Sequence, residues 1–79
     1  MIYTKDLVEF CQNQREKAAE IIKKTRKKKG LTTYRLAKLA GMEVHTIERI
    51  ERGENVYSDN LYKVMMCLKI KNILIEDLN

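Results

Sequence analysis

Three glycines, Gly30, Gly41 and Gly53, divide the middle of this chain into short segments, and proline is absent. The segments carry apolar residues at the three- and four-residue spacing that is typical of amphipathic helices. A glycine commonly follows the last residue of a helix, where a left-handed backbone is needed. Strand-and-turn folds use more proline and glycine than this chain contains. We therefore expect an all-α fold, a compact bundle of about five helices with an extended N-terminal helix.

The first helix is predicted from about Lys5 to Lys29, with Thr4 as its N-cap. At ~1.5 Å per residue it is about 37 Å long, which exceeds what so small a core can cover. Either its first two or three turns project from the domain, or it breaks near residues 12–14. Its apolar stripe consists of Leu7, Phe10, Cys11, Ala18, Ile21 and Ile22.

Three shorter helices are predicted after Gly30. Thr32 is a suitable N-cap for the first, which ends at Gly41, and residues 43–52 form the second, which ends at Gly53. The third begins at 58–60, and residues 70–78 suit either a short strand or a fifth helix, which we favour. The predicted core positions of the three helices are Leu36, Leu39, Ala40, Ile47, Ile50, Leu61, Val64, Met65 and Leu68.

At 79 residues the chain is long enough for one domain. No apolar run is long enough to cross a membrane, so we expect no membrane partner. Cys11 and Cys67 sit among apolar residues and are predicted to be buried, reduced thiols, which suits a cytoplasmic protein. With one histidine and no nucleophile–base pair, we expect no metal site, no cofactor and no enzymatic activity.

The net charge of +5 is concentrated in one part of the chain. Residues 23–42 hold eight basic residues and no acidic one. Such a segment indicates a polyanionic partner, with nucleic acid ahead of a membrane surface. The run 23–29 has a second reading, because cations at the end of a helix offset the partial negative charge of its last carbonyls.

Two short helices joined by Gly41 form a helix-turn-helix at residues 33–52. Ala37 is the small residue needed where the helices touch, and Ile47 and Ile50 anchor the second helix. These residues, and the sequence Ile-Glu-Arg-Ile-Glu-Arg-Gly at 47–53, resemble the Cro/C1-type helix-turn-helix family of bacterial and phage regulators, also called the XRE family. The resemblance covers residues 26–53 and extends more loosely to Leu68.

The resemblance implies a lambda-repressor-like DNA-binding domain over 1–79, with a helical extension at 1–20 and C-terminal helices at 59–79. It implies a sequence-specific transcriptional regulator, which we expect to be a repressor that binds double-stranded DNA as a homodimer. The helical wheel of 43–52 turns Glu43, Ile47, Ile50 and Glu51 to the core and leaves the other face for a major groove.

The resemblance also assigns roles to individual residues. Base contacts are expected from Val44, His45 and Arg49, and Glu48 could accept from a cytosine amino group. Thr33 stands where the family usually carries glutamine, so its reach to a phosphate is shorter. Tyr34 suits either a phosphate contact or a plain surface position. The full set of expected phosphate contacts is Thr33, Tyr34, Lys38, Thr46 and Arg52.

Arg26 and Glu51 match an arginine and a glutamate that the family pairs. Because Glu51 turns toward the core, it needs a partner. We expect a partly buried ion pair that sets the angle of helix 43–52 more than it adds stability.

The dimer surface is expected in the apolar C-terminal tail, at Ile70, Ile73, Leu74, Ile75 and Leu78. The alternative surface is the projecting part of the first helix, at Leu7, Phe10 and Cys11. Two other functions fit the same fold. The chain could be the antitoxin of a toxin–antitoxin pair, with a toxin as its protein partner, or a protein-interaction module that no longer binds DNA.

Overall fold

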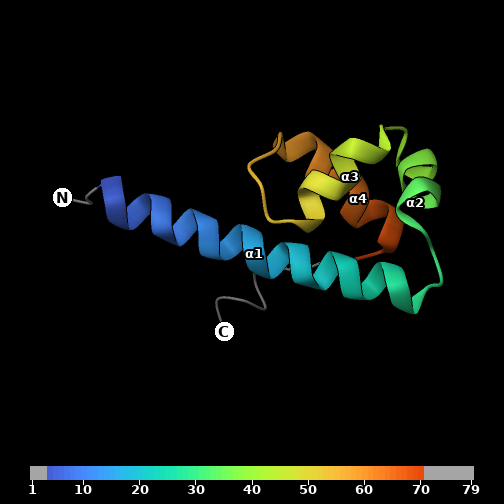
Figure 1. The fold of residues 1–79 in the computed structure, drawn as a ribbon, viewed down its shortest axis with the longest axis horizontal. Coiled ribbons are helices and arrows are strands. Elements are labelled where there is room, and N and C mark those ends of the chain that lie inside the picture. The colour runs from blue at the N-terminus through green and yellow to red at the C-terminus, as the bar shows by residue number, and fades with distance from the viewer. Residues whose placement is uncertain (1–3, 71–79) are drawn as a thin grey trace.

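The computed structural model describes residues 4–70, which form four α-helices and no strand (Figure 1). The helices are α1 (Thr4–Lys28), α2 (Thr33–Ala40), α3 (Val44–Glu51) and α4 (Ser58–Leu68). The predicted all-α class is confirmed, with four helices in the described residues where about five were expected in the whole chain. The fifth predicted helix, at 70–78, lies outside the described residues except for its first position.

Helix α1 is continuous, so the alternative of a break near residues 12–14 is wrong. Its N-terminal half projects beyond the other three helices (Figure 1). Leu7, Val8 and Phe10 are therefore about half exposed. The thiol of Cys11 is exposed as well, which corrects its predicted burial, whereas Cys67 is partly buried. The apolar stripe of α1 continues past the point where any other described helix covers it.

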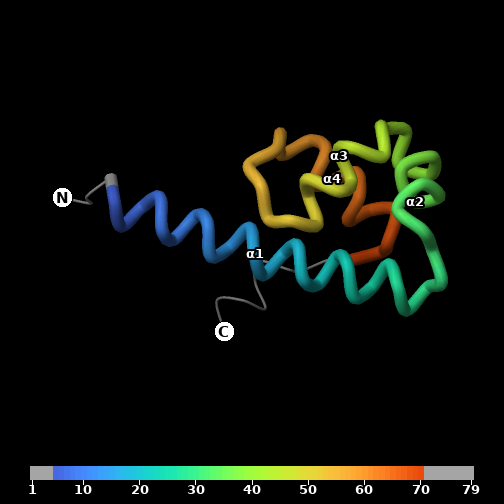
Figure 2. Tube along the Cα trace, in the orientation of Figure 1, coloured from blue at the N-terminus to red at the C-terminus, as the bar shows by residue number. Residues whose placement is uncertain are grey.

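Helices α2, α3 and α4 gather on one side of the C-terminal half of α1 (Figure 2). The buried cluster between them takes residues from all four helices: Ala18, Ile22, Leu36, Ala37, Ile47, Ile50, Val64 and Leu68. Leu39, a predicted core residue, is 56% exposed. The buried face of α2 is centred between Leu36 and Ala37. At 100° per residue, Leu39 lies beside Leu36 but on the side away from Ala37, and it therefore points away from the centre of the buried face.

Helix α2 begins and ends at the predicted capping residues, Thr32 and Gly41. The Thr32 hydroxyl accepts a hydrogen bond from the Arg35 backbone N–H at 3.0 Å. Gly41 has φ +69°, and the Met42 N–H next to it donates to the Ala37 carbonyl at 3.0 Å. This left-handed cap ends α2 abruptly and allows α3 to begin three residues later.

A second glycine joins α3 to α1. Gly53 is buried with φ +76°, and a Cβ atom there would lie 3.2 Å from Cγ of Glu16. The carbonyl of Gly53 accepts a hydrogen bond from Nε of Arg15 at 3.3 Å. The end of α3 can therefore pack closely on the middle of α1 because residue 53 has no side chain.

Candidate nucleic-acid interface

Helix α3 is anchored on one face and open on the other. Ile47 is fully buried and Ile50 is 3% exposed, so these two side chains fix the helix to the core. On the opposite face His45 and Glu48 are exposed. Residue Glu43, expected on the core face, is instead exposed at the start of the helix. An eight-residue helix that is held from beneath in this way can enter a groove of a nucleic acid.

The other two expected base contacts are less exposed. Val44 is partly buried and packs against the core cluster, so only part of its surface is available to a ligand. Arg49 is also partly buried, and its side chain is 41% exposed. It lines a polar groove of about 530 Å³ together with Thr46 and the first turn of α4. The structure thus brings Thr46 and Arg49 together.

Helix α2 presents a basic and aromatic surface. Tyr34 is 57% exposed, and Nζ of Lys38 lies 5.2 Å from the centroid of its ring. This distance is that of a cation–π contact, and both side chains are exposed. Thr33 is partly buried. Because it is the first residue of α2, its backbone N–H is among those that have no acceptor inside the helix. A phosphate is a suitable acceptor at such a position.

A carboxylate lies between two arginines at the end of α3. Nε of Arg49 donates to Oε1 of Glu54 at 3.1 Å, and Nε of Arg52 donates to Oε2 of the same residue at 2.6 Å. Hydrogen bonds from Arg52 and then Arg49 lower the pKa of Glu54 below its ordinary value of 4.5. Nη2 of Arg49 also donates to the carbonyl of Asn55 at 3.0 Å.

The sequence placed Glu54 near the proposed DNA surface, together with Glu43 and Glu48, as an acid that repels phosphate and could suppress non-specific binding, but it did not pair Glu54 with Arg49 and Arg52. The available signal was the position of this acid, one residue after the glycine that ends α3 and close in sequence to two arginines on one helix face.

The expected pair of Arg26 and Glu51 is present and well buried. Nε and Nη2 of Arg26 donate to the two carboxylate oxygens of Glu51 at 2.6 and 3.0 Å. The side chains are 10% and 7% exposed, so the pair is more deeply buried than the sequence suggested. Nη1 of Arg26 also donates to the Leu31 carbonyl at 2.7 Å. This group links the end of α3 to α1 and to the connection between α1 and α2.

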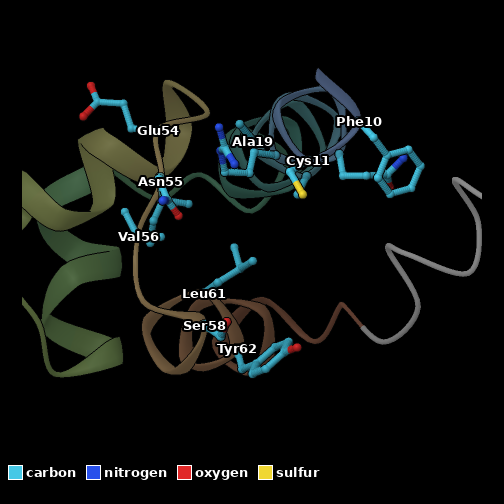
Figure 3. A pocket seen from close by; sticks show the side chains of 13 residues that line it. Phe10, Cys11, Ala19, Glu54, Asn55, Val56, Ser58, Leu61 and Tyr62 are labelled. Carbon is cyan, nitrogen blue, oxygen red and sulfur yellow. The ribbon is translucent and has the colours of Figure 1, made fainter. Parts of the chain in front are cut away.

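An apolar groove of about 460 Å³ lies beside the projecting half of α1. Phe10 and Cys11 border it on one side, and Leu61 and Tyr62 of α4 border it on the other (Figure 3). Of the expected dimer surface, Ile70 is partly buried against the core, whereas Ile73, Leu74, Ile75 and Leu78 lie outside the described residues.

Residues 4–70 contain no group of three or more histidine, cysteine or acidic side chains that could hold a metal ion. None of their helices is both long and apolar enough to span a membrane.

Comparison with known proteins gives one match. The family model of the Cro/C1-type HTH DNA-binding domain matches residues 21–79. The match includes the C-terminal part of α1 and all of α2, α3 and α4, and it leaves out the projecting half of α1. No curated protein and no solved structure matches the chain.

Proposed function

The chain belongs to the Cro/C1-type helix-turn-helix DNA-binding family, and we propose that it is a sequence-specific transcriptional repressor that binds its operator as a homodimer. The observation that carries this proposal is the support of α3 by Ile47 and Ile50, with His45 and Arg49 on the opposite side. A single helix of this length contacts too few base pairs for a unique site, so two copies are needed.

We assign base readout to the outer face of α3. Arg49 donates two hydrogen bonds to O6 and N7 of a guanine, and His45 contacts a neighbouring base edge. Val44 packs its exposed part on a thymine methyl group, and Glu48 accepts from a cytosine amino group. Contacts with the phosphates fix the register of this helix on the duplex, and we assign them to Thr33, Tyr34, Lys38, Thr46 and Arg52.

Selection of binding sites from random-sequence duplexes, at stated salt, tests this proposal. We expect enrichment of a two-fold symmetric sequence whose half-sites lie about one helical turn apart. Arg49→Ala should lower affinity for the enriched duplex by roughly tenfold and change random-sequence binding much less. If no sequence is enriched, or if DNA binding is insensitive to salt, the proposal is wrong, because phosphate contacts require a steep salt dependence.

A second candidate function is favoured by the apolar groove between α1 and α4. As an antitoxin, the chain would bind a toxin there, since exposed apolar surface of this kind marks protein contacts. Co-expression with a toxin-like neighbouring reading frame tests this idea. The chain should suppress the toxicity, and Phe10→Asp should abolish suppression while DNA binding persists. Equal suppression by the wild-type protein and Phe10→Asp would exclude this site.

A further inference from the structure

Arg49 is held by one edge of its guanidinium group. Nε and Nη2, which lie on the same edge, donate to Oε1 of Glu54 and to the carbonyl of Asn55. Both acceptors belong to the loop that directly follows α3. A guanidinium has five N–H donors in one plane, so these two bonds leave the outer edge, formed by Nη1 and the second N–H of Nη2. That outer edge has the two parallel donors that a guanine requires.

Glu54 also places a negative charge between the guanidinium groups of Arg49 and Arg52. Its second oxygen accepts from Nε of Arg52 at 2.6 Å, so one carboxylate serves two guanidinium groups. The carboxylate of Glu54 is ionised at neutral pH, and these hydrogen bonds lower its pKa further. A DNA phosphate that approaches Arg49 or Arg52 must therefore compete with an anion that is already in place.

We propose that Glu54 is a specificity-determining residue, whose carboxylate positions Arg49 to read a guanine and keeps Arg49 and Arg52 from binding the phosphates of unrelated DNA. The inference rests on the proposed DNA readout by Arg49. It makes Glu54 a positioning residue, because the carboxylate acts through the two arginines and does not itself touch the base.

Two variants of Glu54 separate its charge from its geometry. Glu54→Gln removes the charge, so random-sequence duplexes should bind more tightly, with a salt slope steeper by about one phosphate contact. The ratio of specific to random-sequence affinity should fall roughly tenfold, because Arg49 loses its fixed orientation. Glu54→Asp keeps the charge but is one methylene too short to accept from both Nε atoms. It should lower affinity for the specific duplex and leave random-sequence binding unchanged.

Glu43→Gln is the matched control. Glu43 is the exposed N-cap residue of α3, and its side chain makes no capping hydrogen bond. The variant removes one negative charge at the opposite end of α3 from Glu54 and leaves the arginines as they are. Affinity for specific and random-sequence duplexes should rise by the same factor, so that their ratio is unchanged.

The probes are the duplex enriched by the wild-type protein and a random-sequence duplex of the same length. Circular dichroism of each variant verifies that it is folded before binding is measured. Two results would overturn the inference, because Glu54 would then act at most through its charge. One is a Glu54→Gln variant with the wild-type ratio of specific to random-sequence affinity, as expected for Glu43→Gln. The other is a Glu54→Asp variant that binds the specific duplex like the wild type. If the wild type enriches no duplex, the proposed function fails, and the inference fails with it.

Discussion

Replacement of Glu51 by alanine tests how α3 is held against the rest of the domain. In the folded protein Arg26 donates to both carboxylate oxygens of Glu51 and to the Leu31 carbonyl. The side chain of Arg26 is only 10% exposed, so water does not replace the lost partner easily. In Glu51→Ala the guanidinium keeps one of its three hydrogen bonds and remains a buried charge without a counterion.

The expected loss is large relative to the stability of so small a domain. Removal of one partner from a buried ion pair costs about 3–5 kcal/mol. A chain of 79 residues has a total free energy of unfolding of about 4–12 kcal/mol, at roughly 0.05–0.15 kcal/mol per residue. A loss of about 3 kcal/mol corresponds to a melting temperature lowered by about 12–24 °C in a domain of this size. Part of the variant population would then be unfolded near 37 °C.

Thermal and urea unfolding, followed by circular dichroism, measure this loss. Glu20→Ala is the control, since Glu20 is an exposed acid on α1, and its replacement should change the free energy of unfolding by less than about 0.5 kcal/mol. A melting temperature of Glu51→Ala within about 2 °C of the wild type would refute the reasoning, because it would mean that the buried guanidinium does not need its partner.

Three further predictions concern the backbone caps and Glu54. Gly53→Ala should destabilise the protein more than Gly41→Ala in urea unfolding, because both have positive φ but only at Gly53 would the new Cβ meet another residue, Glu16, at 3.2 Å. Lys69→Gly should raise the melting temperature by several degrees, since Lys69 ends α4 with φ +59° and a non-glycine residue there costs about 1 kcal/mol. Glu54 has a lowered pKa in the folded protein, so its stabilising effect is complete above pH 4.5 and is lost as the pH falls through the lowered value. The unfolding midpoints of the wild type and Glu54→Gln should therefore differ at pH 7 and converge in acid.

The sequence was sufficient to predict the helices and their ends, because those depend on local chemistry. Thr32 and Gly41 were identified from residue type and spacing, and the structure confirms both as caps of α2. The order of the four described helices follows from the same signals. These features need no knowledge of distant contacts, since a cap bonds to residues within one turn of itself.

Features that depend on neighbouring helices were less predictable. Helical spacing shows which residues of a helix form its apolar face, but not which part of that face the neighbouring helices cover. Leu39 belongs to the apolar face of α2 and was therefore assigned to the core, although it is exposed. Cys11 belongs to the correct stripe of α1, but its thiol is exposed in the groove between α1 and α4. The contact of Gly53 with Arg15 and Glu16 joins positions that are nearly half the chain apart, and spacing within one helix carries no information about it.

The apolar and the polar contacts of α3 have different consequences. Burial of Ile47 and Ile50 holds the helix on the core without fixing its direction, because the hydrophobic effect is not directional. The hydrogen bonds of Arg26 with Glu51 and Leu31 are directional, and together they connect α3 to α1 at one point.

A double variant that replaces Arg26 and Glu51 by methionine should separate these two effects. Apolar residues of similar size can restore stability at the site of a buried ion pair, so its melting temperature should return toward that of the wild type. Its affinity for the enriched duplex should nevertheless remain reduced, because the angle of α3 is no longer fixed by hydrogen bonds. Recovery of both stability and specific affinity would show that apolar packing alone is enough to orient this helix.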